Sequence, residues 1–130
     1  MSIYQKDNFI NEVIEYANTE PFKEVCGFIC YKNEQLSFEA VKNHSKDVDY
    51  FQISPIDFLQ KKMSGDLLAI FHTHINTKED PSECDIENSK NCLYPFLIYS
   101  LTSEKFDLFD LPHFERSEKG VIKLKGLLND

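Results

Sequence analysis

The chain has 130 residues, of which 42% are hydrophobic, a length and composition that suit one domain with a sizeable core. Its net charge of −8 argues against a nucleic-acid surface, because phosphate binding needs clustered Lys and Arg. No run of about twenty apolar residues is present, so no membrane span is expected. The polar segment 1–7 is unlike a signal peptide and predicts a cytoplasmic location.

The first half of the chain predicts one helix followed by strands. Apolar residues at positions 10, 13, 14 and 17 have helical spacing and predict a helix over residues 6–18. Two apolar, strand-like segments follow, over residues 25–31 and 35–42. A polar loop over 43–49 then leads to a short strand expected at 50–53.

The second half predicts an α/β alternation. Ser54 and Pro55 form a helix-start signal for a helix that runs to Met63 and ends before Gly65. The elements expected after it are a strand over 67–72, a helix over 82–92, and strands over 95–101 and 105–111. This order predicts an α/β fold, a mixed sheet flanked by helices.

The tail, residues 112–130, is expected to lie at the periphery of a single domain that spans residues 1–130, with its core over 6–111. Residues 113–119 are mostly charged, and residues 121–128 alternate weakly between apolar and polar. The alternation favours either an edge strand or a segment that packs on a partner.

The segment from His72 to Asp85 carries the strongest functional signal. His72 and His74 are two residues apart at the end of an apolar strand, so both imidazoles project from one face while Thr73 points to the other. The polar turn 75–81 is long enough to fold back and bring the carboxylate of Asp85 to the same point. Two imidazoles and one carboxylate form a three-ligand zinc set with an open fourth position, as in catalytic sites.

For both Ser82 and Glu24, a non-catalytic interpretation stands beside the catalytic one. Ser82 and Asp85 form a capping-box-like pair, so the serine is expected to cap the following helix, whatever its further role. Glu24 lies between the first helix and the strand over 25–31, where its side chain is able to overhang a sheet end. A carboxylate there suits a general base, whereas a lone glutamate is more commonly a solvated surface residue.

Three short segments together resemble the motif of the JAMM (MPN-plus, or JAB-domain) metalloproteases; they are Glu24-x-x-Gly27, His72-x-His74 and Ser82-x-x-Asp85. Thr73 fills the middle slot that the family leaves to Ser or Thr. The stretch from Phe51 to Asp57 is similar to the prokaryotic branch, which includes the amino-terminal domain of tail-tip assembly proteins of lambda-like phages. The resemblance extends from the first helix to about residue 111.

The resemblance implies a cytidine-deaminase-like sandwich and a role for each matched residue. His72, His74 and Asp85 would bind Zn²⁺, and Glu24 would act as the base for a zinc-activated water. Ser82 would donate a hydrogen bond to the oxyanion. The implied activity is that of a zinc metallopeptidase that hydrolyses a peptide or isopeptide bond.

The remaining Cys and His residues are given no functional role. The four cysteines, at positions 26, 30, 84 and 92, have no zinc-knuckle spacing and are expected to be mainly small buried hydrophobes. His44 and His113 have no partner at ligand spacing and are expected at the surface.

Three functional classes remain open at the level of sequence. The first is a zinc metallopeptidase that acts on a protein or peptide in phage tail assembly. The second is a peptidase that releases or trims a ubiquitin-like or sulfur-carrier protein, and the third is a non-catalytic MPN-type scaffold. Only seven residues separate His74 from Ser82, and the NlpC-type domain that accompanies the phage proteins is absent from this chain. The bond cleaved and the oligomeric state do not follow from the sequence.

Overall fold

The computed structural model describes residues 2–129, and their side chains from residue 8 onward. It contains a five-stranded mixed sheet with the strand order β2-β1-β3-β4-β5. The elements, in chain order, are α1 (Ser2–Ala17), β1 (Cys26–Lys32), β2 (Gln35–Val41), α2 (Pro55–Ser64), β3 (Leu67–His74), α3 (Glu83–Cys92), β4 (Phe96–Ser100), β5 (Lys105–Phe109) and α4 (Glu118–Leu128). The α/β fold with a mixed sheet, as expected from the sequence, is therefore confirmed.

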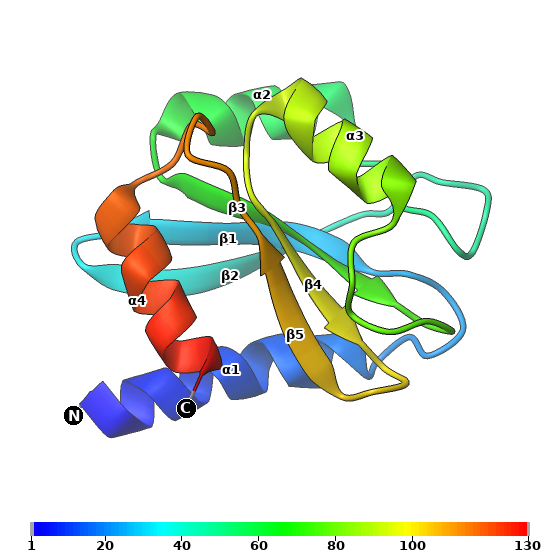
Figure 1. Ribbon diagram of the computed structural model, residues 1–130, viewed down its shortest axis with the longest axis horizontal. Helices are drawn as coiled ribbons and strands as arrows, with labels where there is room; N and C mark the ends of the chain where they lie inside the picture. The colour runs from blue at the N-terminus through cyan, green and yellow to red at the C-terminus, as the bar shows by residue number, and fades with distance from the viewer. Residues whose placement is uncertain (1, 130) are drawn as a thin grey trace.

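β3 occupies the middle of the sheet. It pairs antiparallel with β1 and parallel with β4, and α3 forms the crossover between the two parallel strands (Figure 1). Every residue of β3 is buried, which explains its nearly continuous apolar sequence. Its carboxyl end, where His72 and His74 lie, opens toward the turn that leads into α3.

Helices cover both faces of the sheet (Figure 1). On one face, α1 and α4 pack on a cluster that includes Val13, Leu97 and Leu124. On the other face, α2, α3 and the chain between β2 and α2 cover a second cluster built around Phe28, Ile70 and Phe96. The molecule is thus a three-layer α/β/α sandwich, and His72 and His74 belong to the second face.

Local capping signals set the ends of α2 and α3. The Ser54 side chain accepts a hydrogen bond from the backbone of Asp57, and Gly65 ends α2 with a φ of 81°, a left-handed conformation that suits glycine. α3 begins with a capping box between Ser82 and Asp85. Both helix starts follow the predictions from the sequence.

Two predictions from the sequence are wrong. Residues 50–53 are not a strand but part of an irregular loop, and residues 118–128 are a helix where an edge strand or partner-binding segment was expected. Val121 and Leu124 of this helix are buried in the core, so the end of the chain is not peripheral. The backbone of residues 50–53 bonds to Asn43 and His44 instead of a neighbouring strand, and residues 118–128 bury apolar side chains that are three to four positions apart.

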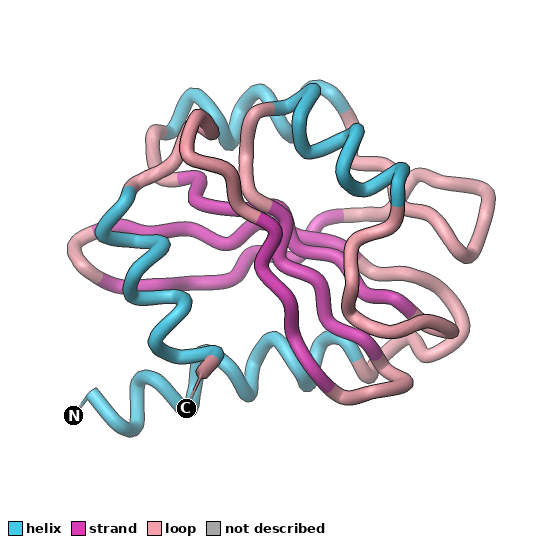
Figure 2. Tube along the Cα trace, in the orientation of Figure 1, coloured by secondary structure: helices cyan, strands magenta, loops and turns pink. Residues whose placement is uncertain are grey.

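Three loops gather at one end of the sheet (Figure 2): the loops that follow β2 and β3, and the loop that precedes β1. The carboxyl end of β3 lies at this end of the sheet. No helix among residues 2–129 is long and apolar enough to cross a membrane.

Candidate metal site

β3 delivers two imidazoles to one face of the sheet. His72 and His74 project toward the second core cluster, with ring centroids 5.2 Å apart, while Thr73 points to the opposite face. His72 is fully buried and His74 is 6% exposed. The two-residue period of the strand places them side by side, as the sequence predicts.

The capping box of α3 delivers the carboxylate. The Ser82 hydroxyl accepts a hydrogen bond of 3.1 Å from the Asp85 amide, and the Ser82 amide donates one of 3.0 Å to Asp85 Oδ2. These two bonds fix the first turn of α3, and the Asp85 carboxylate lies toward the two histidines of β3. The structural role of Ser82 and the placement of Asp85 therefore arise from the same local motif.

The three side chains converge. Asp85 Oδ1 lies 3.1 Å from His72 Nε2, and Asp85 Oδ2 lies 2.9 Å from His74 Nε2. One ligand atom from each of the three residues lies within 4.8 Å of the other two. Ligands around a tetrahedral zinc ion are about 3.3 Å apart for bonds of roughly 2.0–2.1 Å, so small adjustments of these side chains suffice to hold an ion.

His72 provides the test of whether a cation fits. Within the described part of the chain, neither of its buried ring nitrogens has a hydrogen-bond partner, because the contact with Asp85 lacks the required alignment. Burying such a polar atom without a partner costs free energy. A cation between His72 Nε2 and Asp85 would satisfy this nitrogen, and the donor set therefore fits a metal.

Neighbouring groups hold both rings in place. The Phe51 ring stacks on His72 with centroids 4.3 Å apart, and the edge of Phe96 closes another side. His74 Nδ1 donates a hydrogen bond of 2.7 Å to the Lys78 carbonyl, which assigns the proton to Nδ1 and directs Nε2 toward the site. Such outer partners are typical of metal-binding histidines.

The electrostatics of His72 and Asp85 match the needs of metal ligands, whereas a metal would have to displace a proton that His74 holds more tightly than usual. Burial lowers the pKa of His72, which keeps this imidazole neutral. For Asp85, burial alone would raise the pKa, but the contacts with both histidines outweigh it and hold the pKa well below its usual range. For His74, burial is outweighed by Asp85 and the Lys78 carbonyl, and the pKa is raised. The Asp85 carboxylate is thus ionised and ready to bind a cation.

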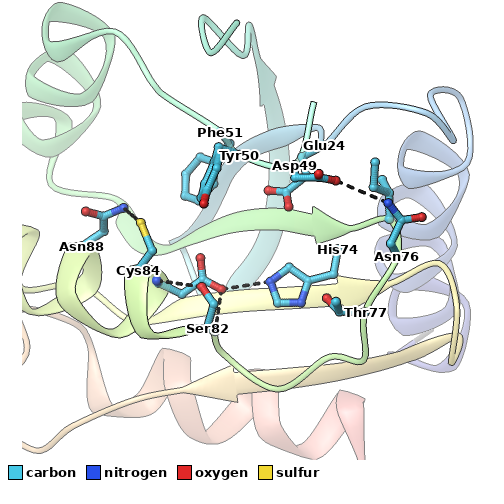
Figure 3. Close-up of a pocket in the computed structure, with 12 residues that line it drawn as sticks. Glu24, Asp49, Tyr50, Phe51, His74, Asn76, Thr77, Ser82, Cys84 and Asn88 are labelled. Carbon is cyan, nitrogen blue, oxygen red and sulfur yellow. Dashed lines mark hydrogen bonds and ion pairs between the residues drawn. The ribbon is translucent and has the colours of Figure 1, made fainter. Parts of the chain in front are cut away.

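Glu24 lies in the same pocket as two of the three candidate ligands, His74 and Asp85, whereas the fully buried His72 does not line it. The pocket has a volume of about 330 Å³, and its lining includes Glu24, His74, Ser82 and Asp85. Figure 3 shows Glu24 and Tyr50 on one side of the pocket and Ser82 and His74 on the other. Glu24 is only 6% exposed, so it is not the solvated surface residue of the alternative reading. Burial raises its pKa to about 8.

All five residues singled out from the sequence thus meet at the carboxyl end of β3, although their chemical roles remain predictions. The sequence reasoning missed Thr73 and Phe51 as supports of the site, and the buried Asn43 beside it. The Thr73 amide donates a hydrogen bond of 3.0 Å to the Val25 carbonyl, and the Thr73 hydroxyl accepts one of 3.0 Å from the Val25 amide. For Thr73, the signal in the sequence was the family motif, which has Ser or Thr between the two histidines. For Asn43, nothing in the local pattern distinguishes it from other loop residues.

Of the other polar candidates, the two histidines lie as expected, but only two of the four cysteines are buried. His44 and His113 are exposed. All four cysteines are free; Cys26 and Cys30 are buried, whereas Cys84 is exposed and lines the pocket.

The fold and the site define an α/β protein with a candidate three-ligand metal centre at a sheet end. Comparison with known proteins agrees: a family model described as prokaryotic homologs of the JAB domain matches residues 7–111. The chain belongs to this family.

Two individual proteins illustrate the likeness. The tail tip assembly protein K of Escherichia phage N15 is 28% identical over 92 residues, which cover 70% of this chain. This chain spans only 38% of the length of that relative. A solution structure of a protein from Desulfitobacterium hafniense shares the fold, with a TM-score of 0.59 and 21% identity over 85% of this chain and 86% of that one.

Proposed function

We propose that the chain is a zinc-dependent hydrolase of peptide or isopeptide bonds, with His72, His74 and Asp85 as the metal ligands. The observation that carries the proposal is the convergence of these three residues beside a pocket that His74, Asp85 and the buried Glu24 line. Imidazole and carboxylate ligands suit zinc, and three of them leave a position free for chemistry. When bound, zinc would act as a Lewis acid and bring the pKa of a water molecule to about 7.

Glu24 is the proposed proton carrier. With its pKa raised to about 8 by burial, the carboxyl holds a proton near neutral pH in the metal-free pocket. A cation nearby favours the charged form and moves the pKa of Glu24 back toward neutrality, where a general base works best. Glu24 would then take a proton from the attacking water and hand it to the leaving amine.

Ser82 is the proposed donor to the oxyanion. Its oxygen accepts the hydrogen bond from the Asp85 amide, so its own hydroxyl proton is free to point into the pocket. A hydroxyl held by a helix cap is a preorganised donor, and such a donor aimed at the developing negative charge contributes about 3–4 kcal/mol to catalysis.

The test is hydrolysis of a defined probe set. The purified, zinc-loaded chain is incubated with a library of peptides from a digested bacterial proteome, and with lysine peptides that carry a Gly-Gly branch on the side chain. New termini are detected by mass spectrometry. We expect cleavage that stops on chelation and in Glu24→Gln, which keeps the proposed ligands. Cleavage of equal extent in wild type and Glu24→Gln would overturn the proposal, as would no zinc-dependent cleavage of either probe.

We infer a role in phage tail assembly, supported by the likeness to the tail tip assembly protein of phage N15. In this setting the substrate would be a linear peptide bond of a tail protein, and the peptide library should be the productive probe. Release of a ubiquitin-like or sulfur-carrier protein would instead show as cleavage of the Gly-Gly branch. A non-catalytic scaffold would cleave neither.

A further inference from the structure

The buried side chain of Asn43 joins the loop after β2 to the segment that carries the proposed base. Asn43 is 9% exposed, and its Nδ2 donates hydrogen bonds of 2.9 Å to the carbonyls of Glu24 and Tyr50. Its Oδ1 accepts hydrogen bonds of 2.9 Å from the amides of Ser45 and Gln52. A side-chain amide has two donor protons and one oxygen with two lone pairs, so all of its capacity is used.

Both backbone groups of Glu24 depend on this loop. Glu24 precedes β1 and has no strand partner, but its amide donates a hydrogen bond of 3.0 Å to the Val48 carbonyl. Its carbonyl accepts the bond from Asn43. The loop over residues 43–52 thus provides hydrogen-bond partners for both the amide and the carbonyl of Glu24.

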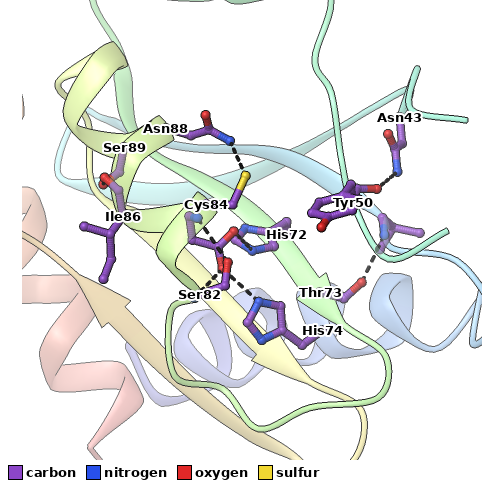
Figure 4. Close-up of polar contacts among 12 residues, drawn as sticks. Asn43, Tyr50, His72, Thr73, His74, Ser82, Cys84, Ile86, Asn88 and Ser89 are labelled. Carbon is purple, nitrogen blue, oxygen red and sulfur yellow. Dashed lines mark hydrogen bonds and ion pairs between the residues drawn. The ribbon is translucent and has the colours of Figure 1, made fainter. Parts of the chain in front are cut away.

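Val25, the next residue, is hydrogen-bonded to β3 instead of to this loop. Thr73 lies between the two histidines of β3 (Figure 4), and Val25 exchanges two hydrogen bonds of 3.0 Å with it. Figure 4 also shows the bond from Asn43 to Tyr50. The Glu24 backbone is therefore fixed between the strand that carries the proposed metal ligands and the loop that Asn43 organises.

We propose that Asn43 is a positioning residue for hydrolysis, which sets where the Glu24 carboxyl points and places Tyr50 as a wall of the pocket. The proposal rests on the proposed function, in which Glu24 is the base. Asn43 itself does not line the pocket, so it acts through Glu24 and Tyr50. A displacement of about 1 Å in a reacting group is enough to lower a rate by about 100-fold.

The first test compares Asn43→Asp with Ser45→Ala. The aspartate keeps the shape and the accepting oxygen but has no proton to donate to the carbonyls of Glu24 and Tyr50. The control removes a hydroxyl whose hydrogen bonds, to the backbone of Asp47, stay within the same loop and leave the Asn43 bridges in place. Three quantities are measured: exchange of the Glu24 amide proton by NMR, zinc affinity by competition with a chelator, and kcat and KM for the library peptide that wild type cleaves fastest.

We expect Asn43→Asp to speed exchange of the Glu24 amide at least tenfold and to lower kcat by 10- to 100-fold. Zinc affinity and KM should stay within threefold of wild type, because the ligands on β3 and α3 are untouched. Ser45→Ala should match wild type in all three. Unchanged kcat in Asn43→Asp, beside lost activity in Glu24→Gln, would overturn the Asn43 proposal alone. Full activity in both variants would overturn the proposed function, and the Asn43 proposal with it.

A second measurement holds even if Asn43→Asp fails to fold. In the wild-type protein, the two side-chain amide protons of Asn43 should exchange with solvent at least 100-fold more slowly than those of an exposed asparagine such as Asn88. Equal exchange rates would show that the bridges to Glu24 and Tyr50 do not persist in solution, and would overturn the proposal.

Discussion

At the scale of single residues, His72 is the side chain whose surroundings point most directly to a cation. It is fully buried against the rings of Phe51 and Phe96, and its ring nitrogens have no hydrogen-bond partner among the described residues. A histidine that served only the core would be expected to find such a partner. The ionised carboxylate of Asp85 beside it supplies the negative charge that a metal ligand set requires.

Replacing Asp85 tests the ligand set. Asp85→Asn keeps the size of the side chain but removes the charge, and we expect zinc affinity to fall by more than about 100-fold, since loss even of an outer partner of a ligand costs 10- to 100-fold. Asp49→Asn is the matched control, because Asp49 also lines the pocket but lies outside the ligand group. Isothermal titration with zinc measures both. Equal losses in the two variants would mean that only the general charge of the pocket matters.

The pKa of Glu24 predicts how the metal-free protein responds to pH. The folded-state pKa of about 8 exceeds the ordinary value of 4.5, so between these values the folded state binds more protons than the unfolded state. The contribution of Glu24 to stability is therefore largest below about pH 4.5 and falls as the pH rises toward 8. Glu24→Gln lacks this titration. Relative to this variant, the free energy of unfolding of the wild-type protein should fall by about 2–4 kcal/mol between pH 5 and 8.5.

Urea unfolding with a chelator present, repeated across this pH range, measures that difference. The comparison with Glu24→Gln cancels the titration of most other groups. A difference in unfolding free energy that stays constant with pH would show that Glu24 is solvated in the folded protein.

At the scale of elements, the sequence predicted what local signals determine. The caps at Ser54 and Ser82 are recognisable from three or four neighbouring residues, and both helices begin where those signals lie. The two imidazoles share a face because of the strand period alone. The ligand group could therefore be inferred from the strand period, the cap and the family spacing.

The two wrong elements show where local patterns fail. Phe51 and Ile53 alternate with polar residues as in a strand, but the backbone around them bonds to the Asn43 side chain and to His44 instead of a neighbouring strand. Their side chains pack on the second core cluster. The apolar alternation reflects that packing, and only the three-dimensional structure reveals that a side chain replaces the strand partner.

The misread tail had a helical signal that competed with the alternating one. Val121, Leu124 and Leu128 follow a three-to-four-residue spacing, and Ser117 caps the helix by accepting a bond from the Gly120 amide. The two glycines of the segment work against this helical signal, since glycine disfavours helices by about 1 kcal/mol. Gly120 has a packing reason, because a Cβ there would meet Leu68 at 2.9 Å.

Paired substitutions in α4 test its place in the core. Leu124 is fully buried, whereas Ile122 on the same helix is 70% exposed. Leu124→Ala should lower the free energy of unfolding by about 2–5 kcal/mol, whereas Ile122→Ala should change it by no more than about 0.5 kcal/mol. Chemical denaturation measures both values. Similar effects of the two substitutions would contradict the helical packing and favour a tail that lies outside the core.

At the scale of the whole molecule, most of the core lies away from the site. The two hydrophobic clusters lie on opposite faces of the sheet, and the candidate ligands lie at the carboxyl end of β3, where the loops meet (Figure 2) and His72 borders the second cluster. The core therefore does not depend on a metal in the way that small zinc-nucleated domains do. The same arrangement places the proposed base on one loop and the ligands on β3 and α3, and hydrogen bonds from Thr73 and Asn43 connect them.

The most direct test of this account is zinc X-ray absorption spectroscopy on the loaded wild-type protein. We predict one zinc per chain with only nitrogen and oxygen ligands at about 2.0–2.2 Å, including two imidazoles. Sulfur scattering at about 2.3 Å would place Cys84, which also lines the pocket, in the ligand set and contradict the assignment. Failure to bind zinc at all would contradict the central claim that His72, His74 and Asp85 form a metal centre.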